Sequence, residues 1–358
     1  MEKFGFVGLP NAGKSSLYNA LAGGGALAAP YAFATVDPNV GVAKEPDPRL
    51  DRLAEMSQSK SVIPASVQFV DIAGLVKGAA QGEGLGNRFL SHIREVDAIV
   101  YVLRAFVDDD VPGSHDPLDQ LETLEIELVY ADVETLTKQL DKRRKAARSD
   151  AAVADEVKAI DAALESLERG VPIYRSGLDE ASRALLRPYF LLTAKVAMAV
   201  VNIDEDQLAD PDAVTSGVQE ALGPGSEVVP ACIQLEAEAV LLDEAERAEM
   251  LEALGLGDGA LARFLRTAYH LLGLRTFFTT GEKESRAWTF RAGATAPEAA
   301  GVIHTDFQRG FIRAECIGWE ELLEAGSWAK AREAGTLRVE GKDYVVQDGD
   351  VMEFRFNV

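Results

Sequence analysis

The residues best suited to chemistry stand near the start of the chain, where 8–15 have the sequence GLPNAGKS. This segment fits the pattern G-x-x-x-x-G-K-[ST], and it lies between a short apolar run, 4–7, and a predicted helix. The glycines let the backbone curl so that several amide N–H groups point at phosphate oxygens, and the helix adds its positive end. We therefore predict a nucleotide-binding phosphate loop, with contacts from Asn11, Ala12, Gly13, Lys14, Ser15 and Ser16.

A Mg²⁺ site is expected beside this loop. Lys14 should lie against the β- and γ-phosphates, and the Ser15 hydroxyl should be a ligand of the metal. The segment 71–74, DIAG, places Asp71 near the metal, commonly through water, and the Gly74 amide against the γ-phosphate. Thr35, between the two motifs, is a further candidate ligand that swings in when the γ-phosphate is present, although one loop threonine is a weak signal.

The segment 202–205 bears on which base is bound. Ras-like proteins recognise guanine with N-K-x-D after a late strand, because the aspartate accepts two hydrogen bonds from the guanine ring N–H and amino group. Here the segment is NIDE, so Ile203 replaces the lysine and Glu205, with its longer side chain, replaces the aspartate. We expect weakened guanine selectivity and a preference for ATP. The alternative is that Asn202 only caps its strand and the base contacts come from elsewhere.

The group that positions the attacking water is less clearly marked. In Ras-like proteins a glutamine follows the D-x-x-G motif and orients this water, but here the residue is Leu75, which cannot do so. Hydrolysis must then be slow, or another group must position the water. His115, in the loop after the predicted strand 98–103, is the catalytic candidate, set against the simpler view that a lone loop histidine is only exposed to solvent.

Composition limits the partners and the compartment. The 358 residues include 36 Lys and Arg against 58 Asp and Glu, a net charge of −22, which excludes nonspecific coating of nucleic acid or anionic membrane. Two cysteines cannot build a disulfide framework and suggest a reducing compartment. The start of the chain lacks the apolar core of a signal peptide, and the longest apolar stretch is too short to cross a bilayer. We expect a cytoplasmic protein without membrane contact.

The elements that must position these residues follow from the apolar pattern. Apolar runs at 4–7, 67–70, 98–103, 196–201 and 228–231 alternate with helical patterns, which predicts an α/β domain with a mostly parallel sheet wrapped by helices. From about 274 the pattern becomes strand-like with tight turns, which indicates a small C-terminal α+β domain.

The middle of the chain is predicted to be helical. Leucines and other apolar residues step by three and four along two segments, at Leu121, Leu124 and Leu128 and then at Val153, Val157, Ile160, Leu164 and Leu167. This spacing predicts an antiparallel, coiled-coil-like hairpin in which each stripe packs on the other. The alternative is two ordinary helices packed on the sheet. The predicted domains are 1–117 with 189–273 for nucleotide binding, 118–188 for the inserted hairpin and 274–358 for the C-terminal domain.

Together, these motifs resemble the YchF-type proteins, also called Obg-like ATPases, a branch of the translation-factor-related P-loop NTPases. The likeness extends over essentially the whole chain. Beyond the motifs described above, it includes the segments 82–87 (GEGLGN), 286–289 (RAWT), 304–307 (HTDF), 310–314 (GFIRA) and 348–352 (DGDVM).

The resemblance implies a P-loop domain, an inserted helical hairpin and a C-terminal domain of the TGS type with a β-grasp fold. It implies a preference for ATP, with the backbone at Ile203 contacting adenine, and Mg²⁺ held by Ser15 and Thr35. It also implies binding to ribosomes, at the large subunit or the whole 70S particle. Family members are thought to use a loop histidine in place of the missing glutamine. Here the loop between Asp110 and Asp116 is shorter, and His115 does not align cleanly with that histidine.

Three functional interpretations remain open at this point. The first is a slow ATPase whose hydrolysis switches its grip on the ribosome. The second is a nucleotide-gated module that binds the ribosome or RNA with negligible turnover. The third is a GTPase.

One basic cluster is unusual in so acidic a chain. It lies near the end of the first predicted hairpin helix, and like charges at helical spacing cost stability unless a partner neutralises them. We therefore expect a contact with ribosomal RNA here, whereas the simpler alternative is a solvated helix face. The cluster consists of Lys138, Lys142, Arg143, Arg144, Lys145 and Arg148.

Overall fold

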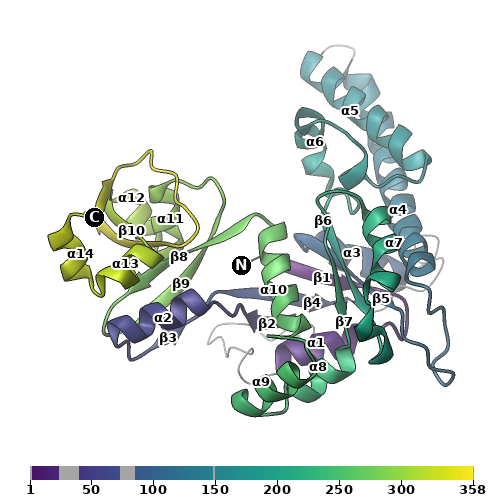
Figure 1. Ribbon diagram of the computed structural model, residues 1–358. Coiled ribbons are helices and arrows are strands. Elements are labelled where there is room, and N and C mark those ends of the chain that lie inside the picture. The colour runs from purple at the N-terminus through teal and green to yellow at the C-terminus, as the bar shows by residue number, and fades with distance from the viewer. Residues whose placement is uncertain (1, 24–39, 73–84, 148–149, 358) are drawn as a thin grey trace. The chain divides into compact units, whose positions relative to one another are not determined.

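The computed structural model describes residues 2–23, 40–72, 85–147 and 150–357. The chain forms two compact units, shown in Figure 1. The first consists of Met1–Ala43 and Gln68–Phe264, and the second of Lys44–Val67 and Leu265–Val358. The predicted domain boundaries differ from this division, because 44–67 and 265–273 belong to the C-terminal unit and the helical hairpin belongs to the first.

The first unit is built on a six-stranded sheet with the order β2-β4-β1-β5-β6-β7. The pairs β1–β4, β1–β5, β5–β6 and β6–β7 are all parallel. Its strands are β1 (Lys3–Val7), β2 (Val40–Lys44), β4 (Ser66–Asp71), β5 (Ala98–Arg104), β6 (Val196–Asn202) and β7 (Val228–Ala231). All residues of β5 are buried, as expected for a central parallel strand covered on both faces. The predicted P-loop α/β fold is therefore confirmed.

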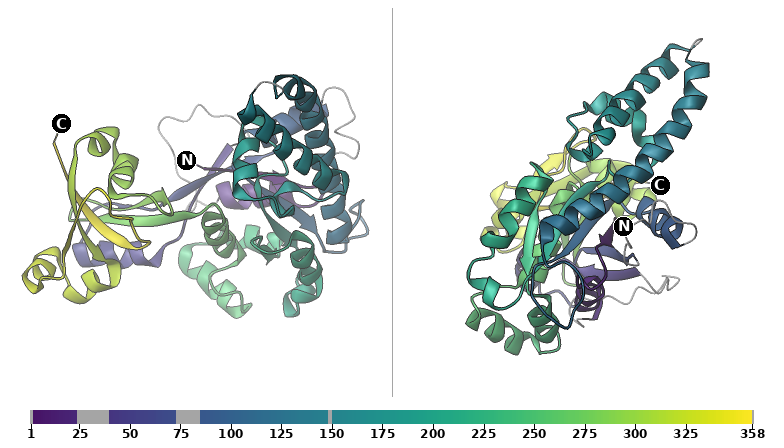
Figure 2. Two further views of the ribbon diagram at one scale, coloured as in Figure 1. Left: turned by 90° about the horizontal axis from the view of Figure 1, so that it is seen from above. Right: turned by 90° about the vertical axis from the view of Figure 1, so that its right-hand side faces the viewer.

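Helices complete the first unit. They are α1 (Lys14–Gly23), α3 (Leu85–Arg94), α4 (Pro117–Ala146), α5 (Ala151–Glu168), α6 (Glu180–Leu186), α7 (Asp212–Leu222), α8 (Ile233–Ala239), α9 (Glu244–Ala253) and α10 (Ala260–Leu271), whose last residues belong to the second unit. Helices α4 and α5 run side by side in opposite directions (Figure 2). Asp116 and Asp150 cap their first turns with side-chain hydrogen bonds to backbone N–H groups.

The packing of α4 corrects one prediction. Leu121, Leu124 and Leu128 do not face α5; they are buried in the core cluster formed with the strands of the sheet. The second half of α4 instead pairs with α5, through Val129, Leu136 and Leu140 against Ile160, Leu164 and Leu167. The spacing of the leucines shows that one side of the helix is buried but not what covers it. The first half of α4 packs on the sheet, as one alternative predicted, and the second half packs on α5, as the hairpin predicted.

The second unit is an α+β domain on a six-stranded sheet with the order β11-β10-β12-β8-β9-β3. Its strands are β3 (Val62–Ile63), β8 (Leu274–Thr280), β9 (Ser285–Arg291), β10 (Phe311–Gly318), β11 (Arg338–Glu340) and β12 (Asp350–Phe356). Its helices are α2 (Pro48–Ser57), α11 (Ala296–Ile303), α12 (Thr305–Arg309), α13 (Trp319–Ala325) and α14 (Trp328–Ala334). The parallel β12–β8 pair and the antiparallel β10–β12 and β8–β9 pairs make a mixed sheet.

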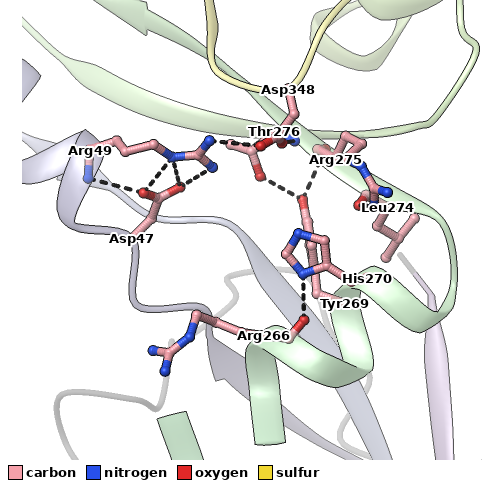
Figure 3. Close-up of polar contacts among 9 residues, drawn as sticks. All are labelled: Asp47, Arg49, Arg266, Tyr269, His270, Leu274, Arg275, Thr276 and Asp348. Carbon is pink, nitrogen blue, oxygen red and sulfur yellow. Dashed lines mark hydrogen bonds and ion pairs between the residues drawn. The ribbon is translucent and has the colours of Figure 1, made fainter. Parts of the chain in front are cut away.

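The segment 44–67 is fastened to the C-terminal residues of this second unit by Arg49. Its guanidinium donates to the carboxylates of Asp47 and Asp348, at 2.8 and 2.7 Å (Figure 3). Asp348 in turn accepts a hydrogen bond from the backbone N–H of Thr276 at 2.8 Å. Among the described residues, no helix is long and apolar enough to span a bilayer.

Candidate nucleotide-binding site

The phosphate loop joins β1 to α1, as its motif predicts. Asn11 and Gly13 take positive φ angles of 65° and 99°, so the backbone turns sharply before the helix begins at Lys14. Gly8 allows the loop to lie directly on β5, because a Cβ at Gly8 would come within 2.5 Å of the carbonyl oxygen of Val102. The strand, the turn and the helix N-terminus together form the cradle that a phosphate group requires.

Lys14 is held inside this cradle. Its side chain is buried, and Nζ donates hydrogen bonds to the carbonyl oxygens of Gly8 at 2.9 Å and Leu9 at 3.0 Å. Burial lowers the pKa of Lys14 from its ordinary value, and the negative charge of Asp71 opposes that shift. A bound polyphosphate would supply negative charge to compensate the buried ammonium of Lys14, so this lysine is suited to bind an anion.

Two of the predicted metal ligands lie together. The Ser15 hydroxyl donates a hydrogen bond to Oδ2 of Asp71 at 3.1 Å, which joins the start of α1 to the end of β4. A hydroxyl and a carboxylate oxygen beside a phosphate cradle are hard oxygen donors of the kind that Mg²⁺ prefers, so these residues fit the metal. Thr35 and Gly74, also predicted at this site, lie outside the described residues, as does Leu75.

A cavity of about 1170 Å³ opens beside the phosphate loop. Three further segments line it in addition to residues of 11–16. They are 106–112 after β5, 202–206 after β6, and 232–241 in and around α8. Parallel strands bind ligands at their carboxyl ends, and all three segments follow such an end. The cavity is large enough for a nucleoside triphosphate.

Asn202 joins three of these segments. Its Nδ2 donates to the carbonyl oxygen of Ala12 at 3.2 Å, and its Oδ1 accepts a hydrogen bond from the backbone N–H of Ile233 at 3.3 Å. Its own carbonyl accepts hydrogen bonds from the N–H groups of Ala105 at 2.8 Å and Phe106 at 3.2 Å. The structure thus places this side chain as a tie between loops that also lines the cavity, and its contact with the base stays a prediction.

The other predicted base residues, Ile203 and Glu205, line the cavity. The Ile203 side chain is buried in the core, and its backbone N–H donates to the carbonyl of Ala231 at 3.0 Å. Glu205 is exposed at the start of a short 3₁₀ helix, Asp206–Ala209, so its carboxylate can reach a ligand. Asp204, between them, accepts a hydrogen bond from the N–H of Gln207 at 3.0 Å and so stabilises this turn.

Of the loop after β5, the sequence singled out His115, whereas the residues that line the site come earlier in the same loop and were not predicted. Phe106, Val107, Asp108, Asp110, Val111 and Pro112 all line the cavity. Its only sequence signal is its place at the carboxyl end of a buried parallel strand. His115, the predicted catalytic residue, is exposed and is not among the described residues of the cavity wall, so the structure does not bring it to the site.

The basic cluster lies in the last turns of α4, and much of its charge is already paired. Lys138 forms an ion pair with Glu134 within α4. Arg143 pairs with Glu156 at 3.4 Å and Arg144 with Asp161 at 3.1 Å, both on α5. Lys142 and Lys145 are exposed. Arg148 lies outside the described residues.

Comparison with protein families gives two matches. A family model described as "50S ribosome-binding GTPase" matches residues 3–148. The C-terminal model of the YchF GTPases, described as a protein of unknown function, matches residues 274–357. The chain is 47% identical to "Ribosome-binding ATPase YchF" of Bacillus subtilis and equally identical to the protein of that name in Haemophilus influenzae, in both cases over 99% of each chain.

Solved structures agree with these matches. The YchF GTPase of Schizosaccharomyces pombe superimposes with a TM-score of 0.88 at 35% identity, over 99% of this chain and 97% of that one. A GTP-binding protein from Pyrococcus horikoshii, at 19% identity and a TM-score of 0.59, shares the fold over the full length of both chains.

Proposed function

The chain belongs to the YchF family of P-loop proteins, and from that premise we propose that it is a Mg²⁺-dependent ATPase that hydrolyses ATP slowly and acts as a nucleotide switch on the ribosome. The observation that carries the proposal is the buried Lys14, held by the carbonyls of Gly8 and Leu9 at the mouth of a cavity of nucleotide size. A buried ammonium beside a helix N-terminus is a site for phosphate groups.

Each residue of the site has a definite task in this proposal. The phosphate loop binds the β- and γ-phosphates through its backbone N–H groups, and Lys14 neutralises their charge. Ser15 and Asp71, joined at 3.1 Å, would hold Mg²⁺, directly and through water. When bound, the metal would stabilise the negative charge on the phosphates and so assist transfer of the γ-phosphoryl group to water. Thr35 would complete this set, as the family resemblance implies.

The preference for ATP over GTP rests on the segment after β6. Relatives carry both names, ATPase and GTPase, so the base must be argued from the residues. Guanine recognition in Ras-like proteins needs a short carboxylate at the position of Glu205, whose longer side chain is exposed at the cavity. The buried Ile203 offers no lysine stem to cover the base, and its backbone would contact adenine.

Slow turnover is proposed because the glutamine that orients the attacking water in Ras-like proteins is replaced here. Leu75 cannot orient a water molecule. His115 is the residue that the sequence suggests, but it is exposed and does not line the cavity. The second candidate function, a nucleotide-gated binding module with negligible turnover, has support from the same two observations.

The proposed partner is the ribosome, through the large subunit or the 70S particle, and the protein would then act in the cytoplasm, where ribosomes are. Relatives at 47% identity are named ribosome-binding. Two surfaces are proposed to make the contact. One is the C-terminal unit as a TGS-type domain, and the other is the basic cluster at the end of α4.

The experiment that tests the proposal combines Lys14→Ala with single-turnover hydrolysis. Wild-type protein should bind ATP with Mg²⁺ and hydrolyse it slowly, and faster when ribosomes are present. Lys14→Ala should lose ATP binding while keeping its circular dichroism spectrum, because this side chain faces the cradle and not the core. Hydrolysis absent both with and without ribosomes would favour the binding module, and undiminished ATP binding by Lys14→Ala would refute the phosphate site itself.

A further inference from the structure

Arg104, the last residue of β5, makes an unusual set of contacts. Its side chain is buried, with 3% of the residue exposed, and its guanidinium donates hydrogen bonds to three backbone carbonyls of the loop that follows. Nε donates to Phe106 at 3.0 Å, Nη1 to Val111 at 2.9 Å and Nη2 to Asp108 at 3.1 Å. The same guanidinium lies 4.5 Å from the centre of the Phe106 ring.

The rest of this loop is held by Gln120 on α4, which is also fully buried. The backbone N–H of Arg104 donates to Oε1 of Gln120 at 2.9 Å, and Nε2 of Gln120 donates to the carbonyl of Arg104 at 2.7 Å. Nε2 also contacts the carbonyl of Asp116 at 3.0 Å. Arg104 therefore binds the middle of the loop, whereas Gln120 ties the end of β5 to the last part of the loop, at Ser114 and Asp116.

The loop extends across the nucleotide cavity. At one end the N–H of Phe106 donates to the carbonyl of Asn202, which begins the base segment. At the other end Nδ2 of Asn11, in the phosphate loop, contacts the carbonyl of Pro112 at 3.5 Å. Residues between these two points form one wall of the cavity. A change in the course of the loop would alter the space for the nucleoside before it altered the phosphate cradle.

We propose that Arg104 is a positioning residue that fixes the nucleoside wall of the cavity and so adds to the affinity for the base and ribose without touching the phosphates. This role rests on the proposed nucleotide function. A loop that is already ordered loses little conformational entropy when the ligand binds, so its contacts contribute more fully to affinity. Arg104 supplies that order through three hydrogen bonds from a buried cation, which are stronger than those between neutral groups.

Arginine suits this position better than lysine does. A guanidinium presents five N–H donors in a fixed planar fork, and its donors here point to carbonyls at three separate positions. The ammonium of lysine is a single point with three donors and cannot reach all three carbonyls in their present places. Arg104→Lys keeps the charge and much of the volume, so it should fold and still release part of the loop.

The test measures the affinity of each full-length variant for two ligands. ATP contains the base, ribose and phosphates, whereas inorganic triphosphate contains only the part that the phosphate loop binds. Both are titrated with Mg²⁺, the triphosphate by competition with a fluorescent ATP analogue. Arg104→Lys and Arg104→Met are compared with Arg94→Met, the matched control. Arg94 also donates to a backbone carbonyl of the first unit, that of Phe190 at 2.9 Å, but Phe190 does not line the cavity, whereas the three residues that Arg104 binds do.

The expected result is selective. Arg104→Met should bind ATP about tenfold more weakly, the effect expected from losing at least one hydrogen bond from a charged donor, and Arg104→Lys should lie between it and wild type. Both should bind inorganic triphosphate within about twofold of wild type, as should the control for both ligands. If Arg104→Met fails to fold, the Arg104→Lys titrations decide.

Two results would overturn the role of Arg104. One is that the Arg104 variants lose affinity for ATP and for triphosphate to the same extent. The other is that Arg104→Met and Arg104→Lys both bind ATP as tightly as wild type does. Wild-type protein that binds neither ligand would refute the proposed nucleotide function instead, so the two failures are distinguishable.

Discussion

The side chain of Asn202 lies directly against Gly13: a Cβ at Gly13 would come within 2.4 Å of the Asn202 Nδ2 atom. Gly13 also has a φ of 99°, in the region that only glycine adopts easily. Asn202 uses this close approach to donate to the carbonyl of Ala12 at 3.2 Å. The end of β6 and the phosphate loop are thus in contact at the second of the two positions where the motif requires a glycine.

The first prediction follows from this contact. Gly13→Ala should weaken ATP binding more than tenfold, because the added methyl both strains the backbone and displaces Asn202. Asn202→Ala should weaken ATP binding less, since it removes the tie to Ala12 but leaves the loop conformation possible. Isothermal titration with ATP and Mg²⁺ measures both. The prediction is wrong if Gly13→Ala binds ATP as tightly as Asn202→Ala does.

The phosphate loop could be predicted because all its determinants lie within eight consecutive residues. The wall built by 106–112 could not, since an irregular loop has no periodicity and the three carbonyls that Arg104 binds are close only after folding. The same reason explains Leu121, Leu124 and Leu128, whose spacing predicts a buried face but not its partner. The segment 44–67 gave no signal that it packs with the C-terminal residues, because Arg49 and Asp348 are 299 positions apart.

The second prediction concerns the base. Glu205 is exposed at the cavity, so Glu205→Asp changes the length of one carboxylate without disturbing the core. It should narrow the preference for ATP over GTP, measured as the ratio of their dissociation constants. A single base-edge contact is worth roughly 1–3 kcal/mol, so a change of about fivefold or more is expected. Adding Ile203→Lys should mainly destabilise the protein, because Ile203 is 2% exposed and an ammonium would be buried.

The ratio of the ATP and GTP dissociation constants of the wild-type protein can also contradict the proposal. Wild-type protein that already prefers GTP would refute the proposed base preference. Asp206→Asn, one residue beyond Glu205 and also exposed at the cavity, is the matched control and should leave the ratio unchanged.

The third prediction concerns the basic cluster. Replacement of Arg143, Arg144 and Lys145 by alanine should weaken co-sedimentation with ribosomes and flatten its salt dependence, since fewer phosphates are neutralised. The effect should be smaller than the charge count suggests, because Arg143 and Arg144 already pair with Glu156 and Asp161. ATP binding should not change. The control is Lys158→Ala on α5 with Arg169→Ala directly after that helix, which removes exposed charges that are also paired with nearby acids.

Co-sedimentation that is undiminished at every salt concentration would place the ribosome contact elsewhere, on the C-terminal unit first of all. Equal losses in the cluster variant and in the α5 control would indicate a general effect of charge and not a local contact.

The last prediction concerns a buried acid in the C-terminal unit. Glu45 is 5% exposed, and its Oε2 has no hydrogen-bond partner among the described residues. Burial raises the pKa of Glu45 to about 8, and the nearby charge of Asp47 adds to the shift. Asp47 itself is bound to Arg49, as Figure 3 shows. Glu45 therefore keeps its proton in the folded unit at pH values where the unfolded chain has released it.

The sign of the pH dependence follows from this difference. Between the ordinary glutamate value near 4.5 and about 8, the folded state binds one more proton at Glu45 than the unfolded state does, so raising the pH lowers the free energy of unfolding. The stability that protonated Glu45 confers is fully present below pH 4.5 and is lost as the pH rises to about 8.

Glu45→Gln should remove this loss and, at pH 8.5, stabilise the unit by roughly 1–4 kcal/mol relative to wild type. The three tryptophans, Trp288, Trp319 and Trp328, all lie in this unit, so fluorescence-detected denaturation between pH 4.5 and 8.5 reports on it alone. Glu55→Gln, at an exposed position on α2, is the control and should follow the wild-type curve. A Glu45→Gln curve parallel to that of wild type would show that Glu45 is already ionised in the folded protein.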